Sequence, residues 1–284
     1  MLIEEHVPVC AEPPVRLFTA RSTGPADRAL LVIHGGPDWD HSYLRQPLER
    51  LADTHRLVFA DLRGCGRSTT GLPQQAYTPD AAVADLLALL DALRIERTDV
   101  LGFSYGGLLA QRLALAAPHR IRRLIIASSS IPPVPDNAYE HWPEVAQLQA
   151  TGNAVWADDP EPSPELVRAD ALAGIPANIW RPEACPEYRR RLEQVRFTAE
   201  WTRPYLDGAL PPARPQNSVE RLAALGLPIL LLHGRQDMTF PATLAEQSAA
   251  VIPHAHVAIL DQAGHMTHID QPEAWLDAIS TFLD

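Results

Sequence analysis

A short stretch around Ser104 most constrains how this chain can fold. An apolar run over residues 99–103 predicts a buried strand, and an apolar, helix-forming run over residues 105–117 follows with no loop between them. Gly102 and Gly106 lie two residues before and after Ser104, so a strand and a helix can pass close together at this corner. We expect strained dihedral angles at Ser104 and a hydroxyl held above the positive end of a helix. This pattern is typical of a serine nucleophile.

Strand-like and helix-like runs alternate on both sides of this corner. Continuous apolar runs of strand length indicate strands buried on both faces, at residues 29–33, 56–60, 99–103, 122–127, 227–233 and 256–260. Helical patterns are expected at residues 43–54, 79–93, 105–117, 241–252 and 271–283. The alternation predicts an α/β fold with a mostly parallel, doubly wound sheet. Residues 1–20 are expected to open it as a hairpin.

The alternation stops between residues 131 and 218. This stretch is rich in proline, contains four tryptophans, and shows helical candidates at residues 143–150, 164–173 and 186–205. It is too long for a connection and too aromatic for a disordered segment. We interpret it as a helical cap domain inserted after the sixth strand, with residues 1–130 and 219–284 forming the core. The alternative is a helical elaboration that makes no contact with substrate.

Composition excludes several classes of protein. The 284 residues are 46% hydrophobic and 21% charged, values typical of a soluble globular protein. No apolar run approaches the roughly 20 residues of a membrane span, and the acidic N-terminus lacks the order of a signal peptide. A cytoplasmic location without membrane partners is therefore the expectation. The net charge of −11 argues against a nucleic-acid partner, whose binding relies on basic surface.

The reactive residue types narrow the chemistry further. All 24 basic residues are arginine, which excludes a Schiff-base lysine and a phosphate-binding lysine. The three cysteines are Cys10, Cys65 and Cys185, scattered without a C-x-x-C motif, so neither a disulfide framework nor a zinc site is indicated. Cys65 is a conceivable nucleophile, but no histidine is placed to activate it.

Two candidate partners of Ser104 follow later predicted strands. Asp237 and His265 each lie just past the end of a strand, on the same edge of the sheet as Ser104. In this order, an aspartate can orient a histidine that removes the serine proton. His268 and Asp261 are alternatives for the same roles. His268 falls inside a helix start and Asp261 shares its strand end with His265, so we favour His265 and Asp237.

The first central strand ends in His34-Gly35-Gly36-Pro37. Glycines at this edge let backbone N–H groups face a ligand, and the N–H groups of Gly36 and Tyr105 are the predicted oxyanion hole. A plain Gly-Pro turn is the structural alternative. Asp61, Arg63 and the glycines after the next strand are interpreted as bracing their own loop.

Together these motifs identify a resemblance to a known family. Gly102-Phe-Ser-Tyr-Gly-Gly107, Gly234-x-x-Asp237 and Gly264-His265 resemble the α/β-hydrolase superfamily over nearly the whole chain. Within it, His34-Gly-Gly-Pro37 and Asp61-x-Arg-Gly-Cys-Gly-Arg-Ser68 resemble the proline iminopeptidase branch, which includes prolyl aminopeptidase and the tricorn-interacting aminopeptidase. The resemblance implies an aminopeptidase that releases a small N-terminal residue, proline above all.

The resemblance also implies how substrate is held. Members of the branch bind the free amino group with cap glutamates, and Glu200 is the candidate here. The branch usually has glycine where Asp38 stands, and this carboxylate is a candidate for binding a cationic substrate. Leu62 replaces a usual glutamine. The insert has 13 carboxylates against 8 arginines, which favours an ammonium group; a solvated acidic surface is the alternative.

The predicted mechanism is acyl transfer from a small-molecule or short peptide substrate, with no metal or other cofactor. A carboxylesterase or lactonase is the alternative within the hydrolases. Outside them, a non-catalytic binding protein and a lyase or cofactor-free oxygenase stay open. The oligomeric state is left open as well.

Overall fold

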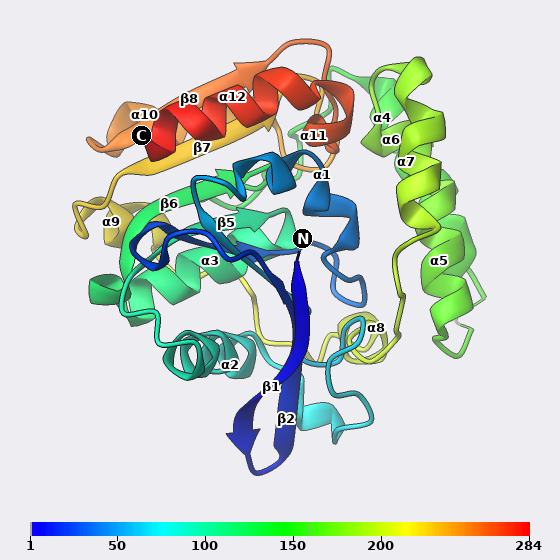
Figure 1. The fold of residues 1–284 in the computed structure, drawn as a ribbon. Coiled ribbons are helices and arrows are strands. Elements are labelled where there is room, and N and C mark those ends of the chain that lie inside the picture. Colours follow the sequence, from blue (N-terminus) through cyan, green and yellow to red (C-terminus); the bar gives the residue numbers. More distant parts are fainter. Residues whose placement is uncertain (1, 159) are drawn as a thin grey trace.

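The chain forms one eight-stranded sheet in the computed structural model, which describes residues 2–158 and 160–284 (Figure 1). The strand order is β1-β2-β4-β3-β5-β6-β7-β8. The strands are β1 (Ile3–Ala11), β2 (Pro14–Arg21), β3 (Ala29–Ile33), β4 (Arg56–Ala60), β5 (Thr98–Phe103), β6 (Ile121–Ala127), β7 (Ile229–Gly234) and β8 (Ala255–Leu260). The opening hairpin β1–β2 joins β4 antiparallel, and every later pairing is parallel. The predicted fold class is confirmed.

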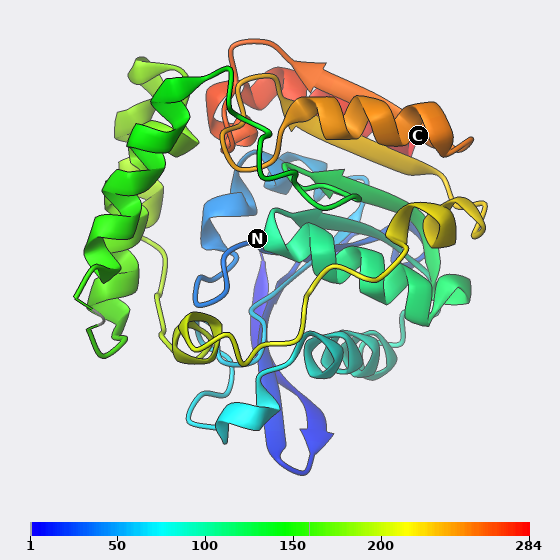
Figure 2. The same cartoon turned by 180° about the vertical axis from the view of Figure 1, so that it is seen from behind.

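Helices cover both faces of this sheet. The α-helices are α1 (Arg45–Leu48), α2 (Pro79–Ala92), α3 (Tyr105–Ala116), α4 (Pro143–Asn153), α5 (Pro164–Ala173), α6 (Ile175–Asn178), α7 (Cys185–Leu192), α8 (Thr202–Leu206), α9 (Ser218–Ala223), α10 (Ala242–Val251), α11 (Thr267–Asp270) and α12 (Pro272–Leu283). Seen from behind, α2, α3 and α10 lie on the near face, while α12 lies on the far face (Figure 2). No helix of the described residues has the length and apolar character to cross a membrane.

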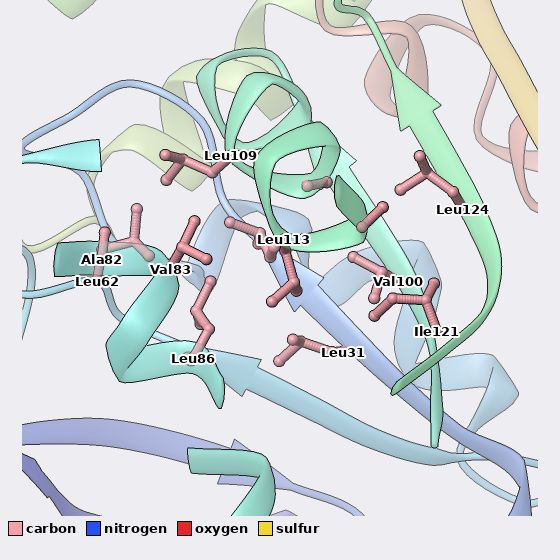
Figure 3. Packing of buried hydrophobic residues seen from close by; sticks show 14 of the residues in the cluster. Leu31, Leu62, Ala82, Val83, Leu86, Val100, Leu109, Leu113, Ile121 and Leu124 are labelled. Carbon is pink, nitrogen blue, oxygen red and sulfur yellow. The ribbon is translucent and has the colours of Figure 1, made fainter. Parts of the chain in front are cut away.

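The core consists of two apolar layers, one on each face. Alternate residues of β3 enter opposite layers: Leu31 and Ile33 join one, Leu30 and Val32 the other. Figure 3 shows the first layer, where Leu109 and Leu113 of α3 and Leu86 of α2 meet side chains of the central strands. Strands buried on both faces must be apolar at every position, which is why these runs read as continuous in the sequence.

Two predicted helices differ from the structure. The run over 43–54 is broken because Gln46 takes extended dihedrals (φ −99°, ψ 131°) before Pro47, as the proline ring requires of its predecessor. The run over 186–205 is two helices, α7 and α8, joined by an irregular segment at residues 193–201. That segment returns to the core and matters for the site described below.

The insert lies beyond the carboxyl ends of the central strands. Between β6 and β7 the described residues contain helices and loops but no strand. Figure 1 shows α4, α5, α6 and α7 together on the side toward which the arrowheads of β6 and β7 point. Sites in doubly wound sheets form at these carboxyl ends of the strands.

Candidate active site

Ser104 sits on the tight corner that its neighbours predicted. Its dihedrals are φ 53° and ψ −120°, and its N–H donates to the carbonyl of Ala127 at 2.9 Å. A Cβ on Gly102 would lie 2.3 Å from the carbonyl oxygen of Gly106, and a Cβ on Gly106 would lie 2.3 Å from that of Ile33. Only glycine fits at both positions, because backbone atoms fill the space a side chain needs.

A chain of hydrogen bonds joins Ser104, His265 and Asp237. The His265 Nε2 lies 3.0 Å from the Ser104 Oγ, and its Nδ1 lies 3.0 Å from Oδ2 and 3.2 Å from Oδ1 of Asp237. Asp237 follows β7 and His265 follows β8, so two neighbouring parallel strands deliver them to the same edge. A carboxylate on Nδ1–H leaves Nε2 free to accept a proton, the arrangement of a general base.

The surroundings of Asp237 keep it ionised. Burial by itself would raise the pKa of this carboxyl, but the neighbouring His265 and its hydrogen bond outweigh burial and hold the pKa below its usual value. The N–H groups of Thr239 and Phe240 donate to Oδ1 at 2.7 and 2.9 Å. His233 is buried beside it and is bonded through Nε2 to the carbonyl of Ser129 at 2.5 Å. Asp237 is therefore a fixed anion that orients His265.

The structure separates the alternatives for base and acid. His268 is fully buried, with its ring centroid 5.1 Å from that of Phe103 and 5.5 Å from that of Trp275, and burial lowers its pKa far below the usual range. Asp261 is exposed and pairs with Arg235. His268 has no hydrogen bond to Ser104 and Asp261 has none to His265, so His265 and Asp237 fit the two roles.

The loop with the predicted oxyanion donors lies against the elbow. A Cβ on Gly35 would lie 2.8 Å from the Ser104 Cβ, and Gly36 takes the left-handed φ of 64°. His34 braces this loop: its Nε2 accepts the N–H of Leu62 at 3.1 Å, so its Nδ1 donates to the Gly35 carbonyl at 2.9 Å. Tyr105 opens α3, where N–H groups have no partner within the helix. The Gly36–Tyr105 oxyanion hole stays a prediction, which this proximity favours.

The loop after β4 is braced as expected. The Asp61 carboxylate accepts the Nδ1–H of His41 at 2.5 Å and the N–H of Arg67 at 3.0 Å. Arg63 forms a buried two-bond pair with Asp85 at 2.7 and 2.6 Å. Cys65 is buried, and burial raises the pKa of its thiol, which does not suit a nucleophile.

Asp38 and Glu200 are not placed as predicted. The structure contradicts direct binding of substrate by Asp38, because its side chain is fully buried and its carboxylate accepts the N–H of Trp201 and the hydroxyl of Thr202. Glu200 accepts the Tyr77 hydroxyl at 2.5 Å and the Gly71 N–H at 3.1 Å. It lines a hollow of about 890 Å³ and is not among the residues that line the cavity beside Gly36, which is described next.

A cavity of about 440 Å³ lies between the Gly36 loop and the insert. Its wall is mostly aromatic and aliphatic and holds one carboxylate; the lining residues are Gly36, Pro37, Trp39, Trp156, Val167, Asp170, Thr202, Tyr205 and Leu206. This size and lining suit a small organic substrate. Of the 13 carboxylates counted in the insert, Asp170 is the one in this lining, while Asp159 lies outside the described residues.

Asp170 was missed at the level of sequence. It lies on α5 three residues after the buried Val167 and therefore on the same face of the helix. The sequence signal that could have identified Asp170 is a carboxylate on the apolar face of this helix. Burial raises its pKa, a hydrogen bond with Trp156 opposes the rise, and no arginine or histidine of the described chain forms an ion pair with it.

Comparison with known proteins places this geometry in a family. The profile of the alpha/beta hydrolase fold matches residues 28–272, and the chain belongs to this family. It is 30% identical over 267 residues to the 2-hydroxymuconate semialdehyde hydrolase of Pseudomonas sp. (strain CF600), covering 89% of this chain and 86% of that protein. It is 26% identical over 270 residues to 3-oxoadipate enol-lactonase 2 of Acinetobacter baylyi, covering 92% and 90%.

The resemblance to the proline iminopeptidase branch is also confirmed. The crystal structure of a proline iminopeptidase-related protein from Thermus thermophilus superposes with a TM-score of 0.74 at 26% identity. The match covers 100% of this chain and 97% of that one. The relatives are thus hydrolases of more than one substrate class.

Proposed function

We propose that this protein is a serine hydrolase that works through an acyl-enzyme. The observation that carries the proposal is the continuous chain of hydrogen bonds from Asp237 through His265 to Ser104. His265 takes the Ser104 proton as Oγ attacks a carbonyl carbon, and the N–H groups of Gly36 and Tyr105 stabilise the oxyanion. The imidazolium then gives its proton to the leaving group. Water, activated by the same histidine, releases the acyl group.

Within this class, we propose a substrate with a free amino group, as in a small aminoacyl amide. Asp170 supports this proposal, because a carboxylate in a partly buried cavity, with no ion-pair partner among the described residues, attracts an ammonium group. The rings of Trp39, Trp156 and Tyr205 in the same wall can add cation–π attraction. The likeness to a proline iminopeptidase-related protein points the same way. Residues 131–218 would then act as the cap that selects the substrate.

The second candidate is an esterase or lactonase. The mostly apolar cavity wall and the likeness to an enol-lactonase favour it. The names of the two curated relatives denote substrates that carry a carboxylate. Asp170 would repel such a substrate, which is why the amine is preferred.

A hydrolysis panel tests the proposed substrate. A prolyl arylamide, its N-acetylated counterpart, a short-chain acyl ester and a carboxylate-bearing lactone would be compared by kcat/KM. We expect the free amine to be the best substrate. Turnover of the ester or lactone alone, or equal cleavage of the blocked arylamide, would give the function to the second candidate.

Replacing Asp170 should weaken binding of the amine selectively. One charge-assisted hydrogen bond contributes about 1.5–3 kcal/mol, so Asp170→Asn should lower kcat/KM for the prolyl arylamide by roughly 10-fold to 150-fold. The acyl ester should be affected less than about threefold, because it lacks the charge. Glu165→Gln, an exposed position on the same helix, is the matched control. An equal loss on both substrates would contradict recognition of the amine.

A further inference from the structure

The loop that carries Gly36 is tied to the insert by one buried carboxylate. Asp38 lies two residues after Gly36 and has a left-handed φ of 71°. Its Oδ2 accepts the Thr202 hydroxyl at 2.7 Å, and both carboxylate oxygens lie 3.1 Å from the backbone nitrogen of Trp201. The Thr198 N–H donates to the Asp38 carbonyl at 2.9 Å. The backbone and the side chain of Asp38 therefore hold the same insert segment.

Further bonds fix that segment against the core. The Thr198 Oγ1 lies 2.6 Å from the Gly64 carbonyl oxygen and 3.0 Å from the Asp38 Oδ1, and its single proton serves one of them at a time. The indole N–H of Trp201 donates to the Arg63 carbonyl at 2.7 Å. Thr202 also lines the cavity beside Gly36. One insert residue thus contacts both the cavity and the tie to the Gly36 loop.

A second buried carboxylate, that of Asp270, ties the loop that carries His265 to the insert. The Oδ2 of Asp270 accepts the N–H of Gly264 at 2.8 Å and that of Trp180 at 2.9 Å, while Oδ1 accepts the N–H of Arg181 at 2.9 Å. Gly264 directly precedes His265, and Trp180 and Arg181 belong to the insert. The Met266 N–H also donates to the Asn178 carbonyl at 2.9 Å. His265 therefore lies between Gly264, which is linked to the insert through Asp270, and Met266, which is bonded to the insert directly.

The insert and the histidine loop approach each other so closely that only glycine fits at position 264. A Cβ on Gly264 would lie 2.9 Å from the Asn178 carbonyl oxygen and 3.1 Å from the Trp180 nitrogen. The two backbones touch at Gly264, so the position of the insert and the position of the histidine loop depend on each other.

We propose that Asp38 and Asp270 are positioning residues through which the insert sets the geometry of the oxyanion donor and of His265. The inference rests on the proposed serine hydrolase function. A carboxylate accepts several N–H groups in different directions at once, so it fixes a loop in orientation as well as in place. Two buried carboxylates are a costly means of adhesion alone, since apolar contacts hold segments together without desolvating a charge. A role in positioning the active site explains why this desolvation cost is tolerated, because small displacements near a reacting bond change the rate strongly.

The test uses Asp38→Asn, Asp38→Ala, Asp270→Asn and Asp270→Ala in the full chain, with the substrate that the panel identifies. Each asparagine keeps one acceptor oxygen, so kcat should fall in the order Asp, Asn, Ala. We expect a loss of at least about tenfold for the alanines with KM within about threefold. Asp261→Asn is the matched control: it is exposed, lies four residues before His265, and should retain wild-type kcat.

Titration of active Ser104 with a fluorophosphonate separates positioning from folding. If the carboxylates position the site, the variants should remain folded. Their kcat per active site should fall, and the fluorophosphonate should label Ser104 more slowly. Wild-type kcat per active site in folded alanine variants would overturn the inference. If the alanine variants fail to fold, Thr198→Val decides, because it removes one hydroxyl outside the substrate cavity. An unchanged kcat in that variant would also overturn it. Failure of the proposed function looks different, since wild type itself would then turn over no panel substrate.

Discussion

Ser104→Ala should abolish turnover while leaving the protein folded. The hydroxyl is the attacking atom in the proposed mechanism, and removing a triad member leaves only the small residual rate from binding and the oxyanion hole, a loss on the order of 10⁴-fold or more. The side chain is only partly buried, so the free energy of unfolding should change by less than about 1 kcal/mol. kcat on the best panel substrate and the midpoint of thermal unfolding are the two measurements.

Labelling with a fluorophosphonate is the control for this prediction. A fluorophosphonate should label the wild type and leave Ser104→Ala unlabelled. Retention of more than a few per cent of the wild-type kcat in Ser104→Ala would mean that another group attacks the substrate. The chain of hydrogen bonds to Asp237 would then be structural only.

The second large effect is expected at His265. His265→Ala removes the acceptor 3.0 Å from the Ser104 Oγ and should lower kcat by several orders of magnitude, since the neutral serine hydroxyl is a poor nucleophile. Asp237 would then be a buried anion without its imidazole partner, so we also expect lower stability. kcat, the thermal midpoint and the rate of fluorophosphonate labelling should all decrease.

His268→Ala is the comparison that makes this prediction specific. The ring of His268 is buried among Tyr43, Phe103 and Trp275, so its loss should lower the free energy of unfolding by roughly 2–5 kcal/mol. The folded fraction should keep most of its kcat, because His268 makes no contact with Ser104. Wild-type activity in His265→Ala together with an inactive, folded His268→Ala would reverse the assignment.

Much of the fold was predictable because its signals are local. Strands such as Ala29–Ile33 read as apolar runs since both of their faces are buried, and this is a property of each strand's own residues. The helix start at Thr78 was readable for the same reason: its hydroxyl accepts the Ala81 N–H at 3.2 Å, three residues away. The helix predicted over 43–54 was wrong where a local rule, the effect of Pro47 on Gln46, was overlooked.

The sequence by itself determined the elbow at Ser104, the order of acid and histidine after parallel strands, and the glycines that let backbones touch. These features follow from short-range sterics and from the periodicity of burial. Only the tertiary structure decided the surroundings of Asp38 and Asp170. The Asp38–Thr202 bond joins residues 164 positions apart, and a carboxylate's partner across that distance depends on how the insert returns to the core. From sequence alone, Asp170 on a helix is most simply a solvated charge, and only the tertiary structure shows that it lines the cavity beside Gly36.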